Sequence, residues 1–301
     1  MIRIGLDLGG TKIEAIAMDR DGAILHRERI PTPRAYDASL AAIRDLVNRV
    51  EDACGHTAAV GIGHPGSLSP ANGLMRNANS TWLNDRPFFE DMARTLDRPL
   101  RLANDADCFA LSEAVDGAGR DGHIVFGVIL GTGVGGGIVI DKRLLSGAQR
   151  IAGEWGHNPL PWPQAHEVLG PRCWCGQRGC IETWLSGPGM AARHEAEEGD
   201  ARTAAALFSA AASGDPSARR SITSYTDRLA RALASVCNLI DPDLIVLGGG
   251  VSNAPGLAEA VQARLPAHVF SDVVTTRIVR HHHGDSSGVR GAAWLWRAEE
   301  V

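Results

Sequence analysis

The chain alternates short apolar runs with polar, glycine-rich turns, which is the pattern of a protein built from both strands and helices. Ile2–Leu8 alternates apolar with other positions, so it predicts a strand, and Ile13–Met18 returns as a second strand after a Gly-Gly turn. Across Ser39–Ala53 the apolar residues recur at helical spacing, and Gly55 ends the expected helix. Strands and helices that follow one another in this way predict an α/β fold.

The second half of the chain opens with the same pattern as the first. A strand expected at Ile124–Leu130 leads into the glycine turn Gly131–Gly137, and another strand follows. Sliding Ile4–Asp19 onto Phe126–Asp141 without a gap brings glycines, apolar positions and the last aspartate into register. We interpret this as an internal repeat, which predicts a duplicated fold of two lobes with a cleft between them. Chance similarity of two glycine hairpins is the alternative.

Composition excludes several classes of protein. The 301 residues carry a formal net charge of −5, and no Lys/Arg-rich run is interleaved with aromatics, so no nucleic-acid partner is expected. No apolar stretch reaches the ~18–20 residues that a membrane span needs. The N-terminal sequence is typical of a strand and not of a signal peptide. We therefore expect a cytoplasmic protein without membrane contact.

The 35 glycines bunch into short clusters, and the first cluster predicts a phosphate contact. In the turn Asp7-Leu8-Gly9-Gly10-Thr11-Lys12, backbone N–H groups at the glycines can face an anion. Thr11 adds a hydroxyl group and Lys12 a cation, while the Asp7 carboxylate stands at a strand end, where it could hold water on Mg²⁺. A simple hairpin turn is the alternative interpretation.

The second cluster, Gly131–Gly137, formally contains the dinucleotide pattern G-x-G-x-x-G. That fingerprint must open a helix, whereas here the expected strand Ile138–Asp141 follows, and the chain has no Walker loop either. We therefore interpret it as a second phosphate hairpin. A third close approach of backbone is expected at Gly248-Gly249-Gly250, after a buried strand, beside an adenosine.

The pair Asn104-Asp105 ends one expected strand and opens a helix. A carboxylate there stands at the positive end of the helix dipole on rigid backbone, which suits a base that accepts a hydroxyl proton during phosphoryl transfer. Ordinary capping of the helix by Asn or Asp is the alternative.

Three cysteines on one tight loop predict a zinc site. The segment Cys173-Trp174-Cys175-Gly176-Gln177-Arg178-Gly179-Cys180 has the form C-x-C-G-x-x-G-C, and a cytosolic protein favours zinc over a disulfide at such a loop. The fourth ligand is expected to be His157, with His166 as the rival. Four protein ligands leave no open position, so the zinc would be structural, and it would fix Glu182, which follows the loop.

Taken together and in this order, the motifs resemble those of the ROK sugar kinases, which belong to the actin-like ATPase superfamily. The resemblance is carried along nearly the whole chain by DLGGTK at Asp7–Lys12, HPGS at His64–Ser67, LANDAD at Leu102–Asp107, LGTGVGGG at Leu130–Gly137, GEWGH at Gly153–His157, CWCGQRGCIET at Cys173–Thr183 and LGGG at Leu247–Gly250. It implies a two-lobed α/β fold with a duplicated ribonuclease H-like architecture. Residues 1–117 would form a small N-terminal lobe joined by a C-terminal helix at 288–301, and residues 118–287 a large lobe with the zinc loop at 157–180.

The resemblance and the glycine turns together assign roles to single residues. Asp105 would be the catalytic base. The sugar would be bound by Asn104, Glu154, His157, Glu182, Gly66, Ser67 and Asn79. Mg-ATP would be bound by Asp7, Gly9, Gly10, Thr11, Lys12, Gly131, Thr132, Gly133, Gly249 and Gly250. Zinc would be bound by His157, Cys173, Cys175 and Cys180, and the second ring nitrogen of the histidine would face the sugar.

Within the family the chain looks most like bacterial fructokinases of the mannofructokinase type, through NANSTW at Asn77–Trp82, GHNPLPW at Gly156–Trp162 and GDSSGVRGAAWLW at Gly284–Trp296. The expected activity is therefore ATP-dependent phosphorylation of a hexose, fructose to fructose 6-phosphate or mannose. An N-acetylhexosamine kinase or glucokinase is the alternative, and a sugar-binding module without catalysis is the alternative from another class. The family also implies a homodimer. Trp155 replaces a smaller aliphatic residue common in relatives, and we expect it to reshape the sugar pocket.

Overall fold

The chain forms two compact units in a computed structural model, which describes residues 2–297 and 299–300. The first unit is made of the residues up to Arg120, Lys142–Ala152 and the residues from Asp285 on, and the second of Asp121–Asp141 and Gly153–Gly284. The lobe predicted to start at residue 1 and the helix predicted at 288–301 include positions 1, 298 and 301, which lie outside the described residues.

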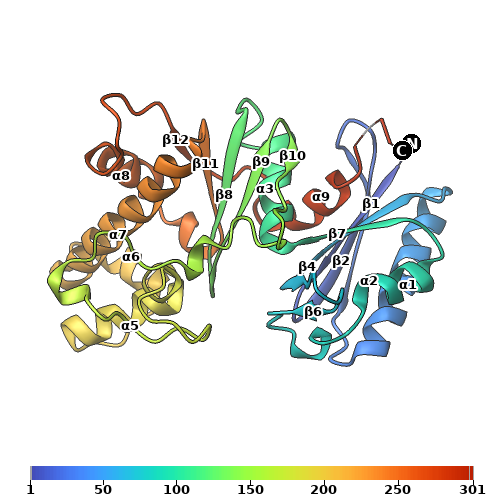
Figure 1. Cartoon of the computed structure of the whole chain (residues 1–301), viewed down its shortest axis with the longest axis horizontal. Helices are drawn as coiled ribbons and strands as arrows, with labels where there is room; N and C mark the ends of the chain where they lie inside the picture. The colour runs from blue at the N-terminus through green and yellow to red at the C-terminus, as the bar shows by residue number, and fades with distance from the viewer. Residues whose placement is uncertain (1, 298, 301) are drawn as a thin grey trace. The chain divides into compact units, whose positions relative to one another are not determined.

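The first unit is a five-stranded sheet with helices packed against it (Figure 1). Its strands are β1 (Arg3–Leu8), β2 (Lys12–Met18), β3 (Ile24–Pro31), β4 (Ala59–His64) and β7 (Leu100–Asn104), in the order β3-β2-β1-β4-β7. Its helices are α1 (Tyr36–Cys54), α2 (Phe88–Leu96), α3 (Asp105–Val115) and α9 (Ser287–Trp294), and a short hairpin pairs β5 (Ser67–Leu68) with β6 (Met75–Arg76). Strand β1 runs antiparallel to β2 and parallel to β4, so the carboxyl ends of β1, β4 and β7 share one edge of the sheet.

Small residues let the last helix lie directly on this sheet. A side-chain carbon added at Gly5 would lie 2.1 Å from the Val289 carbonyl oxygen, and one at Gly61 would lie 1.9 Å from that of Ala292. Only glycine permits such an approach, so β1 and β4 accept α9 at backbone contact distance. The helix at the end of the chain is thus part of the first unit.

The second unit repeats the arrangement of the first. Its strands are β8 (Ile124–Leu130), β9 (Val134–Ile140), β11 (Leu244–Gly248) and β12 (Arg277–Arg280), in the order β9-β8-β11-β12. Strand β8 is antiparallel to β9 and parallel to β11, as β1 is to β2 and β4. The same order and the same directions in both units confirm the predicted duplicated α/β fold.

Helices cover the second sheet and enclose its core. They are α4 (Glu182–Leu185), α5 (Gly187–Glu198), α6 (Ala204–Ala212), α7 (Pro216–Ile240) and α8 (Leu257–Arg264), and two short 3₁₀ turns, η2 (Trp155–His157) and η3 (Ala165–Glu167), lie in the segment between β9 and α4. Asp215 caps α7 by accepting from the backbone N–H groups of Ser217 and Ala218. Across the part of the chain that the structure describes, no helix combines the length and the apolar character that a bilayer crossing requires.

Candidate functional site

The first glycine turn is a tight hairpin between β1 and β2. The Gly9 N–H donates to the Lys12 carbonyl at 3.0 Å, and Thr32 from the end of β3 donates its hydroxyl to the Gly9 carbonyl at 2.7 Å. Gly10 and Thr11 form the exposed tip. The hairpin alternative is therefore correct as a description of the backbone, and the tip is accessible to an anion.

Asp7 stands at the end of β1, opposite Glu14 in the register of the hairpin. Burial, followed by the nearby carboxylates of Asp105 and Glu14, raises the pKa of Asp7 to about 7. The buried Glu14 carboxylate is itself paired with cations, namely Arg29 at 2.8 Å, Arg27 at 3.3 Å and Lys12 at 3.7 Å. A cation placed at Asp7 would relieve the repulsion among these acids, so this end of the strand is suited to Mg²⁺.

The raised pKa makes stability depend on pH in a way that Asp7→Asn should remove. In the folded chain Asp7 keeps its proton up to about pH 7, whereas in the unfolded chain it ionises near its ordinary value of 3.8. The free energy of unfolding should therefore fall as the pH rises through this window. Without ligands, the variant should be no more stable than the wild type at about pH 4. By about pH 8 the free energy of unfolding of the variant should exceed that of the wild type by on the order of 2 kcal/mol. A fully buried carboxylate would give a larger difference, but this side chain is partly exposed.

Urea unfolding of both proteins across this pH range measures the difference. Other titrating groups cancel, because they are common to the two chains. A difference that stays constant with pH would show that Asp7 is ionised throughout.

At the ends of β4 and β7, one side chain joins the two segments predicted to bind the sugar. Asn104 donates its amide to the Gly66 carbonyl at 3.0 Å and accepts from the Ala106 N–H at 2.9 Å. It therefore caps α3, as the alternative interpretation of this pair predicted. Asp105, the first residue of the helix, is exposed at the positive end of the helix dipole.

A cavity of about 620 Å³ opens within the first unit beside these residues. Gly66, Ser67 and Asn104 line it, together with apolar side chains such as Leu68 and Leu102. Gly66 has a φ of 74°, and a side-chain carbon there would lie 2.3 Å from the Arg76 carbonyl, so this turn requires glycine. The predicted sugar-binding residue Asn79 is exposed and is not among the lining residues.

In the second unit, the other two glycine turns meet at a second cavity, of about 690 Å³. Gly131, Thr132 and Gly250 line it beside the apolar side chains of Phe208 and Val251. Gly249, with a φ of 80°, is packed so closely that a side-chain carbon would lie 2.4 Å from the Leu130 carbonyl oxygen. The second and third glycine clusters are thus neighbours in this unit.

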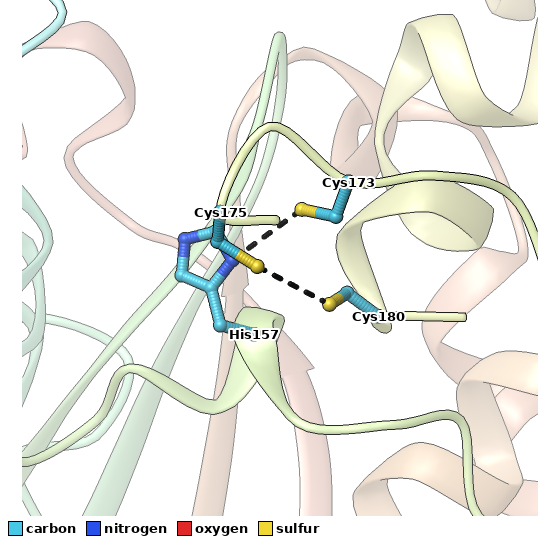
Figure 2. Close-up of side chains that lie close together, drawn as sticks. All are labelled: His157, Cys173, Cys175 and Cys180. Carbon is cyan, nitrogen blue, oxygen red and sulfur yellow. Dashed lines mark hydrogen bonds between the residues drawn. The ribbon is translucent and has the colours of Figure 1, made fainter. Parts of the chain in front are cut away.

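His157 and the three cysteines of the loop converge on one point, as Figure 2 shows. One ligand atom from each of these four residues lies within 4.8 Å of the other three. Cys175 Sγ is 3.6 Å from Cys180 Sγ, and Cys173 Sγ is 3.6 Å from His157 Nδ1. A tetrahedral zinc ion with bonds of about 2.3 Å to sulfur needs ligand separations of about 3.8 Å, so the set fits zinc. His166 lies in η3, exposed and outside this cluster.

Two of the three thiols, those of Cys173 and Cys180, resist ionisation in the fold without a cation. Burial, followed by the two neighbouring thiols, raises the pKa of Cys180 to about 12, and burial also raises the pKa of Cys173. Zinc ligands must be thiolates, so metal binding here would displace protons that the fold alone retains.

Glu182, at the start of α4, accepts hydrogen bonds from the metal loop (Cys173–Cys180) and from strand β9. The Trp174 indole N–H donates to its Oε1 at 2.7 Å, and the Val134 N–H of β9 donates to its Oε2 at 3.0 Å. Gly133 also lies against this carboxylate, since a side-chain carbon added at Gly133 would be 2.7 Å from Glu182 Oε2. Trp174 was not predicted as a site residue from the sequence, although its place between two cysteines was an available signal.

Trp155 is a core residue of the second unit, and the expectation that it reshapes the sugar pocket stays a prediction. Its ring is buried in the core of the second unit, edge-on to Phe126, and its indole N–H donates to the Gly135 carbonyl at 2.9 Å. Gly136 makes room for it, because a side-chain carbon there would lie 2.9 Å from the ring. Of its neighbours, Glu154 is exposed and His157 is partly exposed.

Comparisons with known proteins agree along the whole chain. The family model described as "ROK family" matches residues 3–299. An N-acetyl-D-glucosamine kinase of Shigella flexneri serotype 5b (strain 8401) is 41% identical over 297 residues, which cover 97% of this chain and 98% of the relative.

Solved structures are similar over the same extent. A ROK hexokinase from Thermus thermophilus has a TM-score of 0.87 and 31% identity, covering 98% of this chain and 97% of its own. A ROK family glucokinase from Streptomyces griseus, solved with glucose and AMPPNP, has a TM-score of 0.77 and 28% identity. The match covers 98% of this chain and 99% of the glucokinase. The resemblance seen in the motifs is confirmed, and the chain belongs to the ROK family.

Proposed function

We propose that the chain is an ATP-dependent sugar kinase whose acceptor is N-acetylglucosamine. The observation that carries the acceptor is the full-length similarity to an N-acetyl-D-glucosamine kinase at 41% identity. Fructose, which the sequence motifs favoured, is not the sugar of any relative named above, so the comparisons support the alternative of an N-acetylhexosamine kinase. Hexokinase and glucokinase relatives support the broader class of reaction.

In the first unit, we assign sugar-binding groups to the cavity beside Asn104. Ser67 and Asn104 supply a hydroxyl and an amide there, and apolar side chains supply the remaining wall. Asp105, directly after Asn104, takes the proton of the attacking hydroxyl. The hydroxyl oxygen bonds to the γ-phosphorus while the bond from that phosphorus to the ADP oxygen breaks, so the products are ADP and the sugar phosphate.

In the second unit, we assign the nucleotide base to the cavity beside Thr132 and Gly250, because its apolar wall suits a planar ring. Each glycine hairpin, taken by itself, would bind phosphate through its amides, and in the first unit Thr11 and Lys12 would add a hydroxyl and a cation. Mg²⁺, when bound, neutralises developing phosphate charge, and Asp7 is placed to hold it through water.

We also assign a structural zinc ion to His157, Cys173, Cys175 and Cys180. Three thiolates and an imidazole would complete a tetrahedral ligand set, so the ion would be structural and would have no open position. Nδ1 of His157 faces the sulfur atoms, which leaves Nε2 to face a sugar hydroxyl. Trp174 extends the same anchoring to Glu182.

The test is ADP release from Mg-ATP with N-acetylglucosamine, N-acetylmannosamine, glucose, mannose and fructose at equal concentrations. We expect N-acetylglucosamine to give the highest kcat/KM, at least about tenfold above fructose, because a site that binds the acetamido group loses those contacts with other sugars. A different preferred sugar would keep the kinase and overturn the acceptor. No ADP release with any sugar would favour the sugar-binding module without catalysis.

A further inference from the structure

The chain between His157 and Cys173 lies on a buried ion cluster that no assigned role explains. Glu167, in η3, accepts from Arg228 Nε at 2.7 Å and from Arg231 Nη2 at 2.9 Å, both through Oε1. All three side chains are about 4% exposed or less. Burial alone would raise the pKa of Glu167, but hydrogen bonds from Arg231 and Arg228 outweigh it and lower the pKa, so the group is a carboxylate.

The cluster binds backbone of this segment at several points. Arg231 Nη1 donates to the carbonyls of Pro161 and Trp162, both at 3.0 Å. Glu167 Oε2 accepts from the Gln164 N–H at 2.8 Å, and the Glu167 carbonyl accepts from the Gly170 N–H. Both arginines come from α7, so the segment 161–170 is fastened to the longest helix of the second unit.

The residues on either side of segment 161–170, Leu160 and Pro171, are hydrogen-bonded to the metal loop. Leu160 N–H donates to the Gly179 carbonyl at 2.9 Å, and Gly179 N–H donates to the Pro171 carbonyl at 2.8 Å. Gly170 packs so closely on Gly179 that a side-chain carbon would lie 2.3 Å from its Cα. A shift of the segment would therefore move the start of the cysteine loop relative to His157.

The cluster also reaches the element that carries Glu182. The Arg228 guanidinium lies over the Trp184 ring at 4.8 Å from its centre, and Trp184 belongs to α4, which begins at Glu182. The buried Glu167 carboxylate thus orients two cations. Arg231 contacts segment 161–170, and Arg228 contacts α4.

We propose that Glu167 is a positioning residue for the metal centre, holding the segment 161–170 so that His157 and the cysteines keep their ligand geometry. The inference rests on the zinc site proposed above. A carboxylate suits this task because its two oxygens bind side chains of α7 and backbone of the loop at once. Its loss leaves two buried guanidinium groups without their shared partner, which is strongly destabilising locally.

The experiment measures zinc transfer from the loaded protein to a chromophoric chelator, with zinc content, KM for the sugar and melting temperature. Glu167→Gln should release zinc about 10–100-fold faster than the wild type, with KM raised more than kcat is lowered. The matched control is Glu197→Gln. That partner contacts Arg228 from a half-exposed position at 3.2 Å and binds no loop backbone, so its zinc release should match the wild type.

Two further variants separate positioning from lost stability. Leu207→Ala removes a fully buried side chain from α6, which carries none of the four candidate metal ligands, and should lower the melting temperature without faster zinc release. Arg231→Lys keeps a cation beside Glu167 but loses the fork that reaches both carbonyls. It should speed release in the same direction, and it serves if Glu167→Gln does not fold.

Zinc release by Leu207→Ala as fast as by Glu167→Gln would overturn the proposal. So would zinc release at the wild-type rate in both Glu167→Gln and Arg231→Lys. A wild-type protein purified without zinc, and unable to bind it on addition, would instead overturn the metal site on which the inference depends.

Discussion

Replacing Asp105 by asparagine is expected to lower kcat by about 10²–10⁴-fold and to leave the fold intact. The carboxylate is exposed at the first position of α3, so no core packing depends on its charge. Asn104 caps the helix through its own side chain, and the amide oxygen of the substituted side chain can still accept from the Ala106 N–H, as the Asp105 carboxylate does at 2.9 Å. What the variant lacks is a group that can accept the hydroxyl proton as the new bond to phosphorus forms.

The measurements are kcat from ADP release, sugar and nucleotide affinity by calorimetry, and melting temperature. The control is Asp37→Asn, which makes the same chemical change in the first turn of α1 on an exposed carboxylate, and which should retain wild-type turnover. Near wild-type kcat in Asp105→Asn would remove this residue from the role of base. A loss of affinity equal to the loss of kcat would make it a binding group instead.

Much of the fold was predictable because its signals are local. The match of Ile4–Asp19 with Phe126–Asp141 is a feature of spacing, and the two sheets repeat it in strand order and direction. The cysteine loop was predictable for the same reason, since three ligands lie within eight residues. His157 could be preferred over His166 by its setting, and the convergence of four ligand atoms supports that choice.

Contacts between distant segments were not predictable from the sequence. Trp155 is a large aromatic residue inside a polar motif, and its place depends on the space that Gly136 leaves in β9. Glu167 meets Arg228 and Arg231 from more than sixty positions away. The pKa of Asp7 depends on burial and on Asp105, which lies on another element.

The acceptor sugar was the other point that motifs could not decide. The candidate hexoses differ in the placement of a few polar groups, and short segments such as NANSTW at Asn77–Trp82 do not specify where those groups are bound. Full-length similarity carries more information because it samples every residue of the pocket, and the proposed acceptor rests on it for that reason.

Cys175→Ser is expected to abolish zinc binding and to raise KM for the sugar by about 10–100-fold, the two effects appearing together. A serine hydroxyl is a poor zinc ligand, and three remaining ligands do not close the tetrahedron. The proposed zinc ion would orient the His157 ring directly. It would orient Glu182 through the loop, because Trp174, between two of the ligands, donates to Glu182 Oε1 at 2.7 Å. Loss of the ion should therefore release at once the two groups that we propose to bind the sugar.

Metal analysis of the purified variant, steady-state kinetics and removal of zinc from the wild type by a chelator test this coupling. Chelation should reproduce the KM of the variant, and added zinc should restore only the wild type. The control is Cys54→Ser, a partly buried thiol in the last turn of α1 and outside the cluster, which should keep zinc and KM. Zinc lost with KM unchanged would show that Glu182 and His157 are held by the fold alone. In that case Val134, which donates to Glu182 from β9, would be sufficient to hold this carboxylate.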